Sequence, residues 1–153
     1  MYPYIGRIVM IIKKKLTRSE IMSQVKSKNT KIEVLLRKAL YKTGMRFRIH
    51  ARDIIGKPDI YIKKYKLAIF IDSDFWHGRY YQEGKRIPKT NQEYWISKLK
   101  RNIERDKSVT EKLKEDDWVV LRYWESDIKR DIEKIRNDIC IVLYGLKNKN
   151  LKV

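Results

Sequence analysis

The sequence predicts an α/β domain with a mixed central sheet flanked by helices. Apolar residues recur at helical spacing in three stretches, and short runs rich in β-branched and aromatic residues lie between them. The chain has 153 residues, of which 42% are hydrophobic, enough for one domain with one packed core. The expected order is helix, three strands, helix, strand, helix, which indicates a mixed sheet.

The first helix is predicted to begin at Thr30, with Glu33 three residues later completing a capping box. Its apolar positions from residue 32 to residue 40 recur at helical spacing, and Gly44 is expected to end it. The alternation from Arg46 to His50 then predicts a strand.

The remaining elements follow in order along the chain. Residues 59–63 and 67–72 are predicted as two strands, and a polar loop is expected from 78 to 90. Apolar periodicity predicts a long helix from 91 to about 114 and a final helix from 127 to 143, with a strand at 118–124 between them. Trp118 and Trp124, on this alternating apolar strand, are predicted to be core residues.

Three segments are expected: an N-terminal extension at 1–15, a catalytic-type domain at 16–145 and a basic C-terminal tail at 146–153. The apolar opening is too short to span a membrane and lacks the basic region of a signal peptide. Cys140 is the one cysteine, so neither an intramolecular disulfide nor a Cys-based zinc site is expected. These observations predict a cytoplasmic protein with no membrane partner.

The charge balance is strongly positive. The formal net charge is +18 and the sequence pI is about 9.9, which favours binding to polyanions. Nucleic acid is the first candidate partner and an anionic membrane surface the second. Lysine enrichment from an AT-rich genome is the competing explanation, and it accounts for many lysines but not for the placed acids.

Two acids mark the ends of neighbouring predicted strands. Asp59 follows Pro58 at the start of one strand, and Asp72 ends the next. If these strands pair antiparallel, the two carboxylates lie side by side and can reach one Mg²⁺, with the backbone carbonyl of Ile71 as a further ligand. Such a site is suited to phosphodiester hydrolysis, which needs a divalent cation and an activated water.

His77, five residues after Asp72, is the candidate general acid or base. Glu33 is a further candidate acid that contacts metal-bound water or orients His77. Each has a simpler alternative: Glu33 could serve only the capping box, and acids at strand ends often act as turn or cap residues. His50 is interpreted as structural.

Aromatic and basic residues near these acids are candidates for contacting DNA. Phe75 and Trp76 directly precede His77 and could wedge between base pairs, and Trp95 could do the same or belong to the core. Phosphate contact is predicted for basic residues beside the Pro-Asp pair and on the long helix, although a solvated helix face is the alternative: Lys57, Lys98, Arg101, Arg105 and Lys107.

From about residue 17 to residue 127 the chain resembles the very short patch repair (Vsr) endonucleases, within the PD-(D/E)XK nuclease superfamily. The resemblance rests on ordered, correctly spaced motifs: Thr17-Arg18-Ser19, Ser27-Lys28-Asn29-Thr30, Ile32-Glu33, 44–48, Gly56-Lys57-Pro58-Asp59, Phe70-Ile71-Asp72, Phe75-Trp76-His77-Gly78, Tyr94-Trp95, 100–106 and Trp124-Glu125.

This resemblance implies a restriction-endonuclease-like core and a Mg²⁺-dependent enzyme that nicks one strand of duplex DNA at a T:G mismatch. It implies catalytic roles for Asp59, Asp72, His77 and Glu33, metal binding by Asp59, Asp72 and the Ile71 carbonyl, and intercalation by Phe75, Trp76 and Trp95. It also implies a monomer that acts on double-stranded DNA, with proteins of the MutL type as possible partners.

The sequence departs from the family where a structural zinc site is common. The corresponding positions read Asp74, Arg79, about Tyr81 and Ser126, which lack the Cys and His ligands of such sites, so no structural zinc is expected. This departure leaves open a restriction-type or other DNA endonuclease without mismatch specificity. A non-catalytic nucleic-acid-binding protein is the second alternative.

Overall fold

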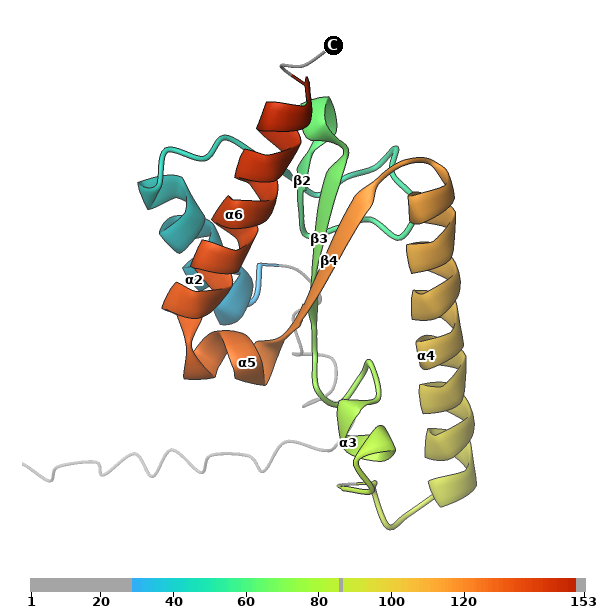
Figure 1. The fold of residues 1–153 in the computed structure, drawn as a ribbon. Helices are drawn as coiled ribbons and strands as arrows, with labels where there is room; N and C mark the ends of the chain where they lie inside the picture. The colour runs from blue at the N-terminus through green and yellow to red at the C-terminus, as the bar shows by residue number, and fades with distance from the viewer. Residues whose placement is uncertain (1–28, 86, 151–153) are drawn as a thin grey trace, which may run out of the picture.

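A four-stranded mixed sheet lies between two layers of helices in the computed structural model, which describes residues 29–85 and 87–150 (Figure 1). The strand order is β1 (Arg48–Ile49), β2 (Ile60–Ile62), β3 (Leu67–Asp72) and β4 (Val119–Trp124). The first three strands pair antiparallel, whereas β3 and β4 are parallel, with Asp72 opposite Trp124. The predicted α/β fold with a mixed sheet is therefore confirmed.

The helices divide between the two faces of the sheet. One face is covered by α2 (Lys31–Lys42), α5 (Glu125–Arg130) and α6 (Ile132–Asn150), and the other by α4 (Gln92–Glu115) (Figure 1). The short helix α3 (Arg79–Gln82) lies beyond the end of β3 that leads to Asp72. Within the described residues no helix is long and apolar enough to cross a bilayer.

Both faces of β3 are buried, which explains its near-continuous apolar sequence. On one face Ile69 packs in a cluster with Leu36 of α2 and Ile139 of α6. On the other face Phe70 packs with Leu113 of α4, and Trp118 packs against the same cluster as predicted. Packing on both faces fixes the register of β3, and with it the positions of the residues at its end.

The predicted cap of the first helix is confirmed. Thr30 Oγ1 accepts a hydrogen bond from the backbone N–H of Glu33 at 3.2 Å, and Glu33 Oε2 accepts one in return from the N–H of Asn29 at 2.9 Å. The chain leaves the helix through Thr43 and reaches Gly44 in the left-handed region at a φ of 81°.

Several predicted boundaries are wrong. The strand expected at 46–50 is only Arg48–Ile49, and the loop expected at 78–90 contains α3. The single helix expected at 127–143 is two helices separated at Asp131, and the second, α6, continues past residue 143 to Asn150. The expectations for the N-terminal extension and for residues 17–28 lie outside the described residues.

Candidate active site

Asp59 is fixed at the end of β3 by two hydrogen bonds. Its backbone N–H donates to the carbonyl of Ile69 at 3.1 Å, and its Oδ2 accepts from the N–H of Ile71 at 2.8 Å. The antiparallel pairing of β2 and β3 is as expected, and the preceding Pro58 is fully buried. The structure thus places the carboxylate beside Ile71, whose carbonyl is another of the three predicted metal ligands.

The environment of Asp59 favours a bound cation. Burial, together with the negative charges of Glu33 and Asp72, raises the pKa of Asp59 to about 6, although the hydrogen bond from Ile71 acts in the opposite direction. The ionised carboxylate is therefore under-compensated. A divalent cation would remove this deficit, and the Asp59 carboxylate and the Ile71 carbonyl are oxygen donors of the kind that Mg²⁺ takes.

Asp72 is buried and bound by Arg122 of β4. Nε and Nη2 of Arg122 donate to its two carboxylate oxygens at 2.7 and 2.8 Å, and the guanidinium stacks over the Phe70 ring at 4.6 Å. A metal at Asp72 would have to share these oxygens with Arg122. The sequence analysis missed Arg122, although a single charge inside an apolar strand was the available signal.

His77 is held by Asp106 of α4, a second residue that the sequence analysis did not assign. The His77 Nδ1 lies 2.6 Å from Asp106 Oδ2 and 3.5 Å from Asp72 Oδ1. Burial opposes protonation of His77, but the hydrogen bond to Asp106 and the charges of both acids outweigh it and raise the pKa of His77. The same contact lowers the pKa of Asp106 against the opposing effect of its burial. Nδ1 is thereby occupied, and Nε2 is the ring nitrogen that this contact does not use.

Glu33 serves as a helix cap and also lies close to the site. Its Oε2 accepts from Arg37 at 2.8 Å as well as from the N–H of Asn29. Only 5% of the residue is exposed, and its charge contributes to the raised pKa of Asp59. The capping explanation is therefore confirmed, while the predicted catalytic role stays a prediction.

The predicted wedge residues come together as one aromatic cluster, formed by Phe75, Trp76 and Trp95. Their ring centroids are 4.9 to 5.9 Å apart, Tyr94 meets Trp95 edge to face at 5.5 Å, and Lys98 lies over the Trp76 ring at 5.0 Å. None of the three cluster residues is fully buried, so each keeps part of its surface in contact with solvent.

The aromatic cluster is attached to α4. Asn102 donates to the backbone carbonyl of Trp76 at 2.8 Å, and Ile103 packs so closely on Gly78 that an added Cβ would lie 2.6 Å from it. Gly78 also has a φ of 82°, where a side chain is strained. The segment bearing His77 is therefore held tightly against the middle of α4.

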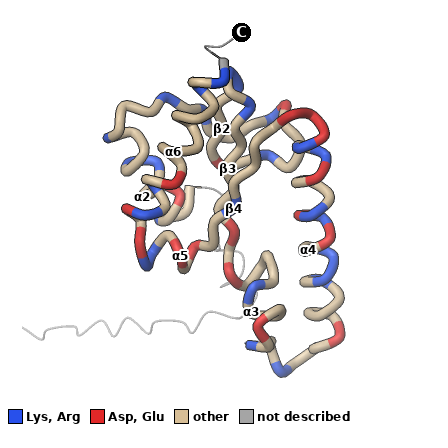
Figure 2. Tube along the Cα trace, in the orientation of Figure 1, with Lys and Arg blue, Asp and Glu red and all other residues tan. Residues whose placement is uncertain are grey.

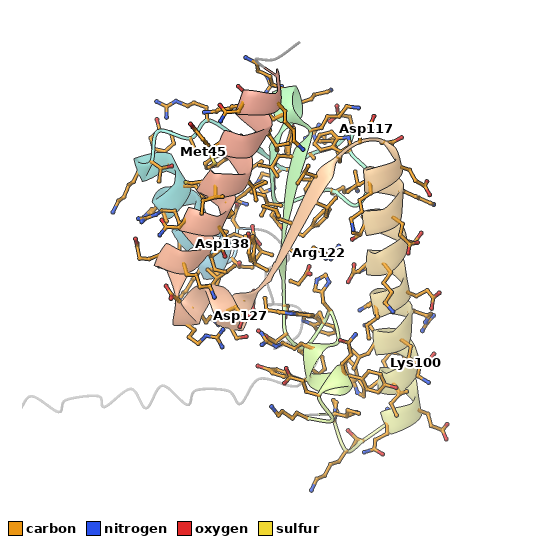
Figure 3. The ribbon with its side chains drawn as sticks, viewed as in Figure 1. Met45, Lys100, Asp117, Arg122, Asp127 and Asp138 are labelled. Carbon is orange, nitrogen blue, oxygen red and sulfur yellow. The ribbon has the colours of Figure 1, made fainter. Side chains whose placement is uncertain are left out.

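Arg101, Arg105 and Lys107 on α4 are exposed, and so is Lys57. Figure 2 shows basic positions spread along α4 with acidic ones between them. A cavity of about 330 Å³ lies on the sheet side of the helix, lined by Asp72, His77, Asp106 and Arg122 among others. Figure 3 shows Arg122 projecting from β4 into the space facing α4.

An under-compensated acid, a histidine–aspartate pair and a cluster of aromatic rings packed edge to face within a basic chain define a class of protein. The arrangement is that of an enzyme that hydrolyses the DNA backbone.

Comparison with known proteins gives the family. Residues 10–83 match the profile described as DNA mismatch endonuclease Vsr. The chain is 44% identical over 126 residues to the type II nicking enzyme V.NmeDIP of Neisseria meningitidis serogroup C, covering 80% of this chain and 85% of that protein. It is 43% identical to V.HpaIIP of Haemophilus parainfluenzae, covering 78% and 84%, and 34% identical to the DNA mismatch endonuclease Vsr of Escherichia coli K12, covering 81% and 78%. The chain belongs to the Vsr family of DNA endonucleases.

Proposed function

We propose that this protein nicks one strand of duplex DNA at a T:G mismatch in a Mg²⁺-dependent reaction. One observation carries the proposal. The continuous segment 71–77 carries two of the three predicted metal ligands, Ile71 and Asp72, together with His77 and two of the three cluster aromatics, and the third ligand, Asp59, is hydrogen-bonded to Ile71. Bond cleavage and base unstacking would therefore occur at one place. The names of the relatives, a mismatch endonuclease and several nicking enzymes, support it.

The proposed metal ligands are Asp59 and the Ile71 carbonyl, with Asp72 shared with Arg122. When bound, Mg²⁺ would stabilise the negative charge that develops on the phosphate oxygens. His77 exchanges a proton through Nε2 with the attacking water or the leaving oxygen, since Nδ1 faces Asp106. Asp106 acts as a positioning residue because it fixes the tautomer and orientation of the imidazole.

The aromatic cluster is the proposed reader of the mismatch. Aromatic and apolar side chains that enter a base step must unstack it, and a mispaired step is easier to open than a paired one. Lys98, over the rings, would place a positive charge beside the adjacent phosphate. Selectivity would therefore come from the lower cost of deforming the mispaired DNA.

The test uses matched duplexes that differ only at one base pair. Strand-specific nicking of a T:G duplex with Mg²⁺, and much slower cleavage of the C:G duplex, is the expected result. Equal cleavage of both would favour the alternative, a Vsr-fold nuclease directed to a sequence and not to a mismatch. That alternative is kept because V.NmeDIP and V.HpaIIP are named simply as type II nicking enzymes.

A third outcome separates binding from catalysis. Tight binding with no Mg²⁺-dependent cleavage of any duplex would leave a non-catalytic DNA-binding protein. The MutL-type partner and the monomeric state stay predictions, to be checked by co-purification and by sedimentation in solution.

A further inference from the structure

The guanidinium of Arg79, at the start of α3, lies among an unusual number of acceptors. Its Nη1 is 3.2 Å from Asp74 Oδ1, 2.8 Å from Ser126 Oγ and 3.1 Å from Asp127 Oδ2. Its Nε donates to Glu83 at 3.1 Å, and its Cζ lies 5.5 Å from the centre of the Trp124 ring. One cation thus joins α3 to the start of α5.

Asp74 completes this Arg79 cluster. Its Oδ2 accepts from the backbone N–H of Ser126 at 3.0 Å, and its Oδ1 accepts from the Ser126 hydroxyl at 2.5 Å. Only 6% of Asp74 is exposed. Two chain segments more than fifty residues apart are therefore fastened by hydrogen bonds that are largely shielded from solvent, where such bonds are strong.

A zinc ion does not fit at these residues. Asp74, Arg79 and Ser126 provide no thiolate or imidazole, and the permanent charge of Arg79 repels a divalent cation. Across residues 29–85 and 87–150, no three side chains of His, Cys, Asp or Glu are grouped to hold a metal ion.

We infer that the Arg79 cluster takes the place of a structural zinc as a metal-independent cross-link of hydrogen bonds and ion pairs. This cross-link positions the segment that bears Phe75, Trp76 and His77. The segment leaves β3 at Asp72 and is bound again at Asp74, so the intervening and following residues have little freedom. Arg79 is a positioning residue in this arrangement. The inference concerns the free protein, so its test does not depend on the DNA substrate.

The first test is hydrogen exchange on the whole protein without DNA. Arg79→Ala is expected to speed exchange at least tenfold for the amides of Tyr80 and Gln82, which donate within this segment, and to leave β3 and α6 protected. Arg130→Ala is the matched control, because Arg130 lies 3.0 Å from the other oxygen of Asp127 but its side chain is 75% exposed. Equal effects of the two changes would overturn the inference.

The second test reports on position. In protein labelled with 5-fluorotryptophan, the four tryptophans give separate ¹⁹F signals. Arg79→Ala is expected to broaden the signals of Trp76 and Trp95 while Trp118, beyond the opposite end of α4 from Trp95, stays sharp. Arg79→Lys keeps the positive charge but loses the planar array of guanidinium donors. Its Trp76 and Trp95 signals are expected to be less broadened than those of Arg79→Ala. Unchanged Trp76 and Trp95 signals would contradict a positioning role.

The third test measures whether the protein contains zinc. No stoichiometric zinc is expected by elemental analysis, and a zinc chelator is expected to leave exchange in residues 73–85 unchanged. One tightly bound zinc per chain, with chelator-accelerated exchange in this segment, would overturn the inference. If Arg79→Ala does not fold, Ser126→Ala, which removes only the bridging hydroxyl, is measured in the same way.

Discussion

The environment of Asp59 opposes its negative charge and so weakens the fold. Burial and two neighbouring acids raise the pKa of its carboxyl to about 6. In a chain without bound metal this is a local cost. A site that must take up a cation is expected to carry such a cost.

Replacing Asp59 with Asn should therefore stabilise the metal-free protein at neutral pH. The folded-state pKa of about 6 exceeds the unfolded value of about 3.9. The loss of folding stability caused by the Asp59 charge is therefore absent below about pH 4 and complete above pH 6. The gain in free energy of unfolding, at most about 3 kcal/mol, is expected at pH 7.5 and not at pH 4. Urea unfolding without divalent metal measures it.

Asp53→Asn is the control for this change, because Asp53 is exposed and paired with Lys63. It should show no comparable gain. Asp59→Asn should also abolish nicking while it leaves DNA affinity largely intact. Retained cleavage would remove Asp59 from the mechanism, and a variant less stable than the parent at pH 7.5 would contradict the electrostatic account.

Asp106→Asn tests the histidine pair. Loss of the Asp106 charge should lower the pKa of His77, because that contact raises it in the parent protein. NMR titration resolves both histidines of the chain, and His50 should not shift. If His77 acts as a base, the acidic limb of the pH–rate profile should move to lower pH while the maximal rate falls. An unchanged pKa for His77 would contradict the pairing.

The sequence was sufficient to find the acids and the histidine of the site but not their partners. Asp59, Asp72 and His77 lie on one continuous stretch, so strand ends and spacing revealed them. Asp106 and Arg122 reach the site from α4 and β4 through tertiary packing. The single charge of Arg122 in an apolar strand was a local signal, but no local pattern specifies which residues Asp106 and Arg122 contact. Their contacts depend on the crossing of a helix over a sheet.

Among the secondary structure elements, too, those with a local sequence signal were predicted and those set by tertiary contacts were not. Strongly periodic elements such as α4 were predicted almost to their ends, because their apolar faces decide their length. The break between α5 and α6 was missed, although Asp131 caps α6 by accepting from the N–H of Lys134 at 3.0 Å. The earlier start of α5 depends on Asp74, whose Oδ2 accepts from the backbone N–H of Ser126 in the first turn of α5. That contact is long-range and leaves no local signal.

Gly78 lets the segment that bears His77 pack closely against Ile103 of α4. The variant Gly78→Ala tests that contact. The added Cβ would meet Ile103 and would have to adopt a positive φ, so a loss of about 1 to 3 kcal/mol in the free energy of unfolding is expected. Gly84→Ala is the matched control, since Gly84 has a φ of 68° with no atom within 4 Å. Its cost should be smaller. A double variant with Ile103→Ala should show favourable coupling, and additive effects would argue against the steric contact.

The net charge of +18 predicts DNA binding that weakens steeply with salt. Replacing Lys98, Arg101 and Arg105 together with Gln should reduce the slope of log K against log salt by roughly 2 to 3, about 0.9 for each phosphate that is no longer neutralised. The control removes the same charge from the opposite helical layer, with Lys129, Lys134 and Lys147 changed to Gln. Equal slopes for the two triple variants would show that α4 has no special role in binding phosphates.

Three residues of α4 hold the segment that bears His77. Trp95 packs on Phe75, Asn102 donates to the Trp76 carbonyl, and Asp106 pairs with His77. These positions span roughly 16 Å along one rigid rod. Any tilt of the rod that accompanies base stacking therefore also changes the distance between Asp106 and His77. The proposed base recognition and the proposed proton transfer therefore both depend on the position of α4. We expect a substrate that stacks poorly on the aromatic residues to be cut slowly even when it is bound well.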